Sequence, residues 1–258
     1  MPIPTIIKAS CLIENPRNEI IGIVIPSFKE SANIRNLLLE IRKFIPDSKI
    51  AIVDDSPDNE TVSVVQALRF NNLTLIHRAY KGGRGSAVIE GMQALIKENC
   101  SRIIEMDADF SHPPKQLTEL ISLSCNQNLD LLIASRYLPS SQILNWPFSR
   151  RIFSLSSNHL ARWLLQVPIS DYTNGYRIYS KCAVLKILET CGRLGSGFIS
   201  LSEILVNLFY RDFKVGETPT IFTNRLRGES SVTFKEIKNA LFGLVKIYFL
   251  KKQLISIK

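Results

Sequence analysis

Two aspartates separated by one residue are the side chains of this chain best suited to hold a metal ion. Asp107 and Asp109 follow the apolar segment 103–106, and a pair of prolines at 113 and 114 fixes a turn soon afterwards. Two carboxylates placed where a strand ends and the chain bends can converge on one hard cation. A capped loop is the alternative, because Asp often begins the turn before a helix.

Polar residues follow two further apolar segments in the same way. Residues 20–25 run into Pro26-Ser-Phe-Lys-Glu30, and residues 49–53 run into Asp54-Asp55. In an open parallel sheet, ligands bind beyond the carboxyl ends of the strands. Acidic residues scattered at random would not fall repeatedly on one edge, so the sequence predicts a single site made by three strand ends.

The elements that would position this site alternate between strand and helix from residue 20 to residue 136. We expect strands at 19–25, 49–53, 73–77, 103–106 and 129–134, with helical patterns between them. Short connections favour an α/β fold with a mostly parallel sheet and helices on both faces. The glycines at 82, 83 and 85 precede a helix and can hold a phosphate on backbone N–H groups, although they do not form a P-loop.

After residue 140 the pattern changes. Residues 146–166 form a basic amphipathic helix, whose arginines either bind an anion or form a solvated face. A polar turn at 171–177 is followed by helices near 181–191 and 200–211, a short β pair at 213–217 and 220–223, and a basic loop at 224–231. We divide the chain into an N-terminal arm (1–18), one α/β domain (19–231) and a C-terminal amphipathic helix (232–258).

Composition narrows the choice of partners. The chain has 258 residues, 45% of them hydrophobic, and a formal net charge of +9, which favours an anionic partner. A nucleic-acid-binding module is disfavoured because RNP-type aromatic motifs and zinc knuckles are missing and acids occupy the strand ends. The five cysteines are scattered without a Cys-x-x-Cys pair, which favours a reducing compartment. No apolar run approaches the ~18 residues of a membrane span.

Taken together, these segments resemble the family 2 glycosyltransferases with the GT-A fold, most closely their polyprenol-phosphate (dolichol-phosphate) mannosyltransferase branch. The resemblance covers roughly residues 20–245. Its motifs are Pro26-Ser-Phe-Lys-Glu30, Val53-Asp-Asp-Ser-Pro-Asp58, Gly83-Arg-Gly-Ser-Ala87, Met106-Asp-Ala-Asp-Phe-Ser-His-Pro113, Ser135-Arg-Tyr137, Trp146 through Asn158, Asp171-Tyr-Thr-Asn-Gly-Tyr-Arg177, Glu203, Glu217-Thr-Pro-Thr-Ile-Phe222, Arg225 and Gly228-Glu-Ser230.

The resemblance implies a role for each matching position. The nucleotide sugar would lie against Pro26, Phe28, Glu30, Val53, Asp55, Asp107, Ala108, Asp109 and Arg225. Mg²⁺ or Mn²⁺ would be held by Asp107, Asp109 and Ser111. The acceptor phosphate would be bound by Arg136, Arg150 and Ser154, which together with Asp109 would form the catalytic set.

The implied reaction is inverting transfer of a hexose, with mannose from GDP-mannose as the first expectation, to a polyprenyl phosphate. UDP-glucose or UDP-N-acetylhexosamine as donor, or a glycan as acceptor, remain open. A glycan hydroxyl would need a base such as Asp171, Glu203 or Asp212. Three positions depart from the family pattern: Ser111 stands where some members have Gln, Ser231 where Lys is common, and Ser200-Leu201 where close relatives have an aromatic residue and Gln.

The C-terminal helix is expected to place the enzyme peripherally on the cytoplasmic face of a membrane. Ile237, Leu241, Leu244 and Tyr248 share one helical stripe, whereas the lysines 235, 238 and 246 and the phenylalanines 242 and 249 lie outside it. Lysines and aromatics together suit an anionic headgroup region. The alternatives are an ordinary helix that closes the domain, and a small membrane-anchoring subunit of the kind some relatives use.

Overall fold

The computed structural model describes residues 19–78, 80, 82–192, 194, 199–224 and 234–256, with backbone only for 234–241. The predicted arm at 1–18, Arg225 and the Gly228-Glu-Ser230 motif lie outside the described residues.

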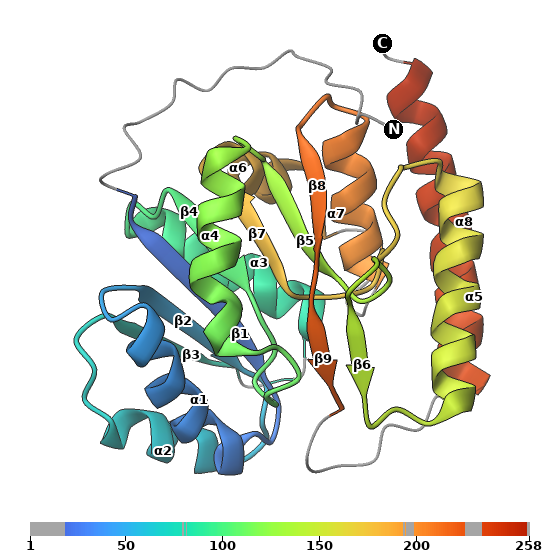
Figure 1. Ribbon diagram of the computed structural model, residues 1–258. Coiled ribbons are helices and arrows are strands. Elements are labelled where there is room, and N and C mark those ends of the chain that lie inside the picture. The colour runs from blue at the N-terminus through green and yellow to red at the C-terminus, as the bar shows by residue number, and fades with distance from the viewer. Residues whose placement is uncertain are drawn as a thin grey trace.

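A seven-stranded sheet forms the centre of the molecule, with strand order β3-β2-β1-β4-β7-β5-β8 (Figure 1). All neighbouring pairs are parallel except those of β7, so the predicted mostly parallel sheet is confirmed. The strands are β1 (Ile21–Ser27), β2 (Lys49–Asp54), β3 (Leu73–His77), β4 (Arg102–Glu105), β5 (Leu131–Ser135), β7 (Arg177–Ser180) and β8 (Val215–Pro219).

The antiparallel strand β7 was not predicted. It lies between β4 and β5, at the end of the segment expected to be only a polar turn. Arg177 is fully buried and donates to the carbonyls of Tyr172, Asn174 and Leu201, and the hydroxyl of Tyr179 donates to Glu105. Polar side chains that find buried partners remove the hydropathy pattern by which a strand is recognised.

The predicted β pair around Pro219 is wrong. β8 pairs with β5 in the large sheet, whereas β9 (Ile221–Thr223) pairs with β6 (Gln142–Leu144) in a separate two-stranded sheet. Only Thr220 separates β8 from β9, and the shortest common hairpin loop needs two residues. The chain therefore passes from one sheet to the other and carries β9 beyond the carboxyl end of β5.

Helices cover both faces of the sheet, as predicted. α1, α2 and α4 pack on one face with Ile23 and Ile25 of β1, and α3, α6 and α7 pack on the other with Val24. Glu30 is the N-cap of α1, and the side chains of Ser31 and Asn33 donate to Glu60 and Glu30. The helices are α1 (Ser31–Phe44), α2 (Glu60–Ala67), α3 (Arg84–Lys97), α4 (Leu117–Asn126), α5 (Phe148–Leu165), α6 (Lys181–Thr190), α7 (Ile199–Phe209) and α8 (Phe234–Ser256), with a 3-10 turn at Pro114–Gln116.

The C-terminal helix α8 packs against α7 and lies beside α5 (Figure 1). Ile247 and Leu254 are buried, and the ammonium of Lys251 donates to the Leu164 carbonyl at 3.0 Å and to the Gln166 side chain at 2.7 Å. Phe242 and Phe249 are 64% and 59% exposed, which confirms that they project away from the packed stripe. Across the described residues, none of the helices has both the length and the apolar run that crossing a membrane requires.

Candidate active site

The three polar strand ends lie on one edge of the sheet, as the sequence predicted, and their strands are neighbours. β1 stands between β2 and β4, and Pro26 is in register with Val53. The backbone N–H of Asp55 donates to the Ser27 carbonyl at 2.9 Å, so the turn after β2 continues the pairing with β1. Phe28, at the tip of the turn after β1, is 38% exposed. The predicted nucleotide-binding residues of β1 and β2 thus share one edge.

Asp55 connects this edge to the glycine-rich turn before α3. Its buried carboxylate pairs with Arg78, with an Nη2–Oδ2 distance of 2.6 Å, and accepts the backbone N–H of Gly83 at 3.0 Å. Gly83 has φ of 87°, a conformation that residues with a side chain rarely adopt. The carboxylate of Asp55 is therefore oriented by two segments that lie 23 and 28 residues away in the sequence.

The turn after β4 carries the predicted metal ligands. The backbone N–H of Ser111 donates to Asp109 Oδ1 at 3.1 Å, and the Ser111 hydroxyl is buried without a hydrogen-bond partner among the described residues. Ala108 is buried between the two aspartates. Two carboxylates and a buried hydroxyl on one turn are the oxygen ligands that a hard divalent cation prefers. No set of three His, Cys, Asp or Glu side chains in the described part of the chain forms a metal cluster, so a cation here would need further oxygens from substrate or water.

Arg84 holds this turn from the side of α3. Its Nε and Nη2 both donate to Asp107 Oδ1, at 3.0 and 2.8 Å, and its Nη1 donates to Glu105 Oε1 at 2.5 Å. Burial works against the charge of Arg84, yet Asp107 and then Glu105 outweigh it and raise its pKa. Local sequence gives Arg84 no role, because its partners lie 21 and 23 residues away.

His112 stabilises the same turn through its two ring nitrogens. Its Nδ1 accepts the backbone N–H of Asp107 at 3.0 Å, so its Nε2 carries the proton and donates to Asn174 Oδ1 at 3.0 Å. Its ring stacks on Tyr176 with centroids 4.9 Å apart. Burial lowers the pKa of His112, which keeps the imidazole neutral and suited to this role.

Arg136 lies at the carboxyl end of β5 and is paired with Asp171. Its Nε and Nη2 donate to the two carboxylate oxygens at 2.7 and 2.8 Å, and Nη2 also donates to Thr173 at 2.8 Å. Burial alone would raise the pKa of Asp171, but the ion pair with Arg136 lowers it. The sequence predicts a possible base at Asp171 and gives no sign of this ion pair.

The three predicted acceptor residues are brought together around two aromatic rings. The guanidinium carbons of Arg150 and Arg136 lie 4.4 and 5.3 Å from the ring centroid of Trp146. The Tyr137 hydroxyl donates to Ser154 Oγ at 2.5 Å. Residues from the end of β5 and from α5 therefore form one cluster.

Phe222 of β9 joins this cluster to the turn that carries the predicted metal ligands. Its ring meets His112 edge-on at 5.7 Å and Trp146 at 5.3 Å, and the backbone N–H of Thr223 donates to the Ser111 carbonyl at 3.3 Å. The two halves of the site are thus linked by the strand whose pairing was predicted wrongly.

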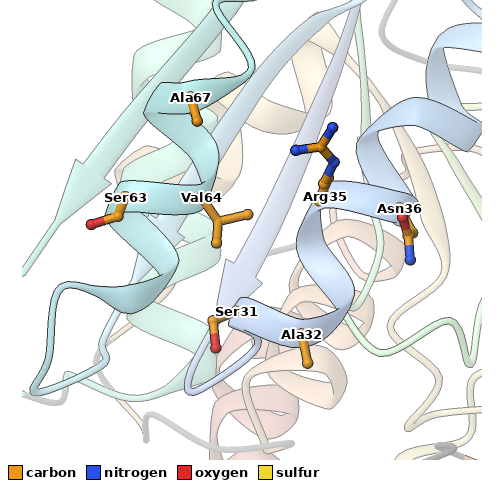
Figure 2. Close-up of a pocket in the computed structure, with 7 residues that line it drawn as sticks. All are labelled: Ser31, Ala32, Arg35, Asn36, Ser63, Val64 and Ala67. Atoms are coloured by element: carbon orange, nitrogen blue, oxygen red, sulfur yellow. The ribbon is translucent and has the colours of Figure 1, made fainter.

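A separate hollow of about 360 Å³ lies between α1 and α2 (Figure 2). Its lining contains no carboxylate, imidazole or thiol and includes none of the predicted site residues. The lining residues are Ser31, Ala32, Arg35, Asn36, Ser63, Val64 and Ala67. We assign it no part in the site.

The fold defines the class of protein. Solved structures of glucosyl-3-phosphoglycerate synthase from Mycobacterium tuberculosis superpose on it, one of them in complex with Mn²⁺, uridine diphosphate and phosphoglyceric acid. That structure has a TM-score of 0.67, covering 90% of this chain and 79% of the other. At 13% sequence identity the likeness shows the fold alone, which is the expected GT-A glycosyltransferase fold.

The sequence then defines the family. The model of glycosyl transferase family 2 matches residues 22–188, and the chain belongs to this family. It is 30% identical over 227 residues to polyprenol monophosphomannose synthase from Mycolicibacterium smegmatis, covering 87% of this chain and 85% of that protein. It is 32% identical over 230 residues to undecaprenyl-phosphate mannosyltransferase from Micrococcus luteus, covering 86% and 91%. The expectation of a family 2 glycosyltransferase is confirmed, and the protein is an enzyme.

Proposed function

We propose that this glycosyltransferase transfers mannose from GDP-mannose to a polyprenyl phosphate with inversion. The observation that carries the proposal is the cluster of Arg136, Arg150 and Ser154 around the rings of Trp146 and Tyr137. The indole N–H of Trp146 is buried without a partner among the described residues and adds a hydrogen-bond donor. Two guanidinium groups with further donors suit a phosphate. The names of the two curated relatives support the lipid acceptor.

A phosphate acceptor simplifies the chemistry that the protein must perform. A phosphate monoester is mostly ionised at pH 7, its second pKa being about 6, so it needs positioning more than deprotonation. One of its oxygens attacks C1 of the mannose while the bond from C1 to the diphosphate oxygen breaks. The bonding electrons leave with GDP, and direct displacement inverts C1. Arg150 and Arg136 orient the attacking phosphate, and Arg225, outside the described residues, is proposed to contact the donor phosphates.

Asp107, Asp109 and Ser111 would hold Mg²⁺ or Mn²⁺. When bound, the cation offsets the negative charge that develops on the leaving diphosphate. Asp109 is the proposed principal ligand, and Asp107, whose Oδ1 accepts two hydrogen bonds from Arg84, is the proposed supporting ligand.

A glycan acceptor is the second candidate, and the structure weakens its chemistry. Asp171, one of three candidate bases, is buried and paired through both oxygens with Arg136. Glu203 is buried within α7, and Asp212 lies in the turn after it. A carboxylate with a lowered pKa and two strong hydrogen bonds is a poor proton acceptor, which favours an acceptor that arrives ionised.

We also propose that α5 and α8 rest on the cytoplasmic surface of a membrane. A polyprenyl chain resists leaving the bilayer by ~0.8 kcal/mol per CH₂, so the enzyme must approach the lipid. Phe148 and Trp163 of α5 are 77% and 74% exposed, and α8 exposes Phe242 and Phe249 beside Lys246 and Lys252. Exposed aromatic and basic side chains together suit anionic headgroups. A small anchoring subunit on the same surface is an additional proposal.

The decisive experiment is a donor screen. The enzyme with a short polyprenyl phosphate and Mn²⁺ is supplied in turn with GDP-mannose, UDP-glucose and UDP-N-acetylglucosamine, and nucleotide release is followed. We expect turnover with GDP-mannose that requires the lipid phosphate. Turnover with a UDP-sugar but not with GDP-mannose would show that the proposed donor is wrong. Turnover with a glycan but not with the lipid phosphate would show that the proposed acceptor is wrong.

A further inference from the structure

Arg84 belongs to a continuous buried network that ends at the metal-binding turn. The Tyr179 hydroxyl of β7 donates to Glu105 Oε2 at 2.7 Å, and Arg84 Nη1 donates to Oε1 of the same carboxylate. Glu105 is fully buried on β4, so its carboxylate is a fixed point for the guanidinium. The other edge of the guanidinium then reaches Asp107.

The geometry leaves Arg84 little freedom. A methyl group at Gly175 would lie 1.9 Å from Arg84 Nη2, so the guanidinium rests directly on the backbone of the loop before β7. A planar guanidinium that donates to two carboxylates cannot rotate without losing one of them. Both bonds to Asp107 fall on Oδ1, which fixes the rotation of that carboxylate.

We propose that Arg84 is a positioning residue that orients Asp107 for the metal–nucleotide complex. The inference rests on the proposed function and adds a residue to the same site. Groups that orient a metal-binding carboxylate change metal affinity by about 10- to 100-fold when they are removed. Neutralising Glu105 is the competing explanation for the presence of Arg84, since a buried carboxylate needs a partner.

The test separates these two roles with the double variant Arg84→Met/Glu105→Gln. Both buried charges are removed together, so neither is left unpaired. The amide oxygen at position 105 would still accept the hydrogen bond from the Tyr179 hydroxyl. Mn²⁺ affinity is measured in the presence of GDP, and of UDP in parallel, from the paramagnetic resonance signal of unbound Mn²⁺. Melting temperature is recorded for each variant. We expect the double variant to melt close to the wild type and to bind Mn²⁺ about tenfold or more weakly. Wild-type affinity in the double variant would overturn the inference.

Arg84→Lys is the second test variant. It keeps a positive charge beside Glu105, so the fold should be preserved without a second substitution. A lysine cannot donate to both carboxylates as a fork, so we expect Mn²⁺ affinity to stay low. Full affinity in this variant would show that charge alone matters and would also overturn the inference.

Arg102→Met is the matched control. Arg102 is a buried arginine at the start of β4, the strand that ends with Glu105. It pairs with Glu19 and donates to Ser124. Its loss should lower the melting temperature and leave Mn²⁺ affinity unchanged. If wild-type protein binds no Mn²⁺ with either nucleotide, the proposed function fails; if it binds and the Arg84 variants bind equally well, only the present inference fails.

Discussion

At the scale of single residues, the site is built from charged side chains whose partners limit what they can do. Arg136 illustrates this, because two of its nitrogens are engaged by Asp171 and Thr173 and only part of the guanidinium can meet a ligand. Arg150 is half-buried and stacks on Trp146, so it is the better candidate for direct contact with the acceptor. The ion pair of Arg136 with Asp171 fixes one wall of the cluster in which Arg150 would contact the phosphate.

Asp109→Asn should abolish turnover and preserve the fold. The change keeps the acceptor for the Ser111 N–H but removes the charge that a divalent cation requires. We expect kcat to fall by about a hundredfold or more, in line with the loss of a metal that offsets leaving-group charge. Activity near that of the wild type across a Mg²⁺ or Mn²⁺ titration would refute the assignment.

Arg150→Ala should raise KM for the lipid phosphate or lower kcat, with little change in donor affinity. Loss of one charge-assisted contact is worth about 1.5–3 kcal/mol, which corresponds to roughly tenfold to a hundredfold in kcat/KM. Arg151→Ala is the control, because Arg151 is the exposed neighbour on the same helix. Equal losses of donor affinity and acceptor use would instead indicate a donor or structural role.

The ion pair of Asp171 with Arg136 should make the free energy of unfolding depend on pH in the acid range. The folded protein lowers the pKa of Asp171 below its ordinary value of 3.8, so the unfolded chain takes up that proton first as the pH falls. The stabilisation is therefore complete above about pH 3.8 and is lost as the pH drops through the lower, folded pKa. We expect Asp171→Asn to cost about 3 kcal/mol at pH 7, because it leaves a buried arginine without its charge partner.

Urea unfolding of the wild type and of Asp171→Asn at several pH values checks this prediction. The difference between the two should shrink as the pH falls below 3.8. A difference that stays constant down to about pH 2.5 would mean that the ion pair does not carry the stabilisation.

At the scale of elements, the last helix is part of the packed body. Ile247 and Leu254 are buried against the elements beneath α8, so deletion of everything after residue 231 would expose core surface as well as remove a membrane contact. Lys251 ties α8 to the carboxyl end of α5, the helix that carries Arg150 and Ser154. Burial lowers the pKa of Lys251, because removal from water disfavours the charged ammonium.

Lys251→Met should loosen the end of α5. A lysine at a helix C-terminus satisfies carbonyls that have no intrahelical partner. Losing these two hydrogen bonds should cost about 1–3 kcal/mol in unfolding free energy and speed amide exchange in the last turn of α5. Lys252→Met, next to it and exposed, is the control and should change neither measurement. Equal behaviour of the two variants would contradict the role given to Lys251.

At the scale of the whole molecule, α5 and α8 form one side of the protein, away from the α1 and α2 side (Figure 1). Arg150 and Ser154 of the predicted acceptor cluster lie on α5, so a membrane on this side would present the lipid phosphate to Arg150 while the tail stays in the bilayer. The net charge of +9 acts in the same direction on an anionic surface.

Phe242→Ser/Phe249→Ser should therefore reduce binding to vesicles that contain anionic lipid and leave the melting temperature nearly unchanged. Both rings are largely exposed, so their removal costs little packing. Co-sedimentation at low and high salt separates apolar from electrostatic binding, and Leu39→Ser, an exposed apolar residue of α1, is the matched control. Sedimentation equal to that of the wild type would remove α8 as a membrane contact.

Local sequence patterns determined the sheet, its parallel strands and the edge where Asp55, Asp107 and Asp109 lie. Strand and helix periodicity are short-range properties, and the carboxyl ends of parallel strands must share an edge whatever the details of packing. Tertiary structure alone decided which side chains meet. Arg84 with Glu105, Arg136 with Asp171 and His112 with Asn174 are separated by 21, 35 and 62 residues, and each pair forms only after strands and helices have docked. The same holds for β7 and β9, because β7 hides its polar side chains in buried hydrogen bonds and β9 pairs with a strand about eighty residues earlier.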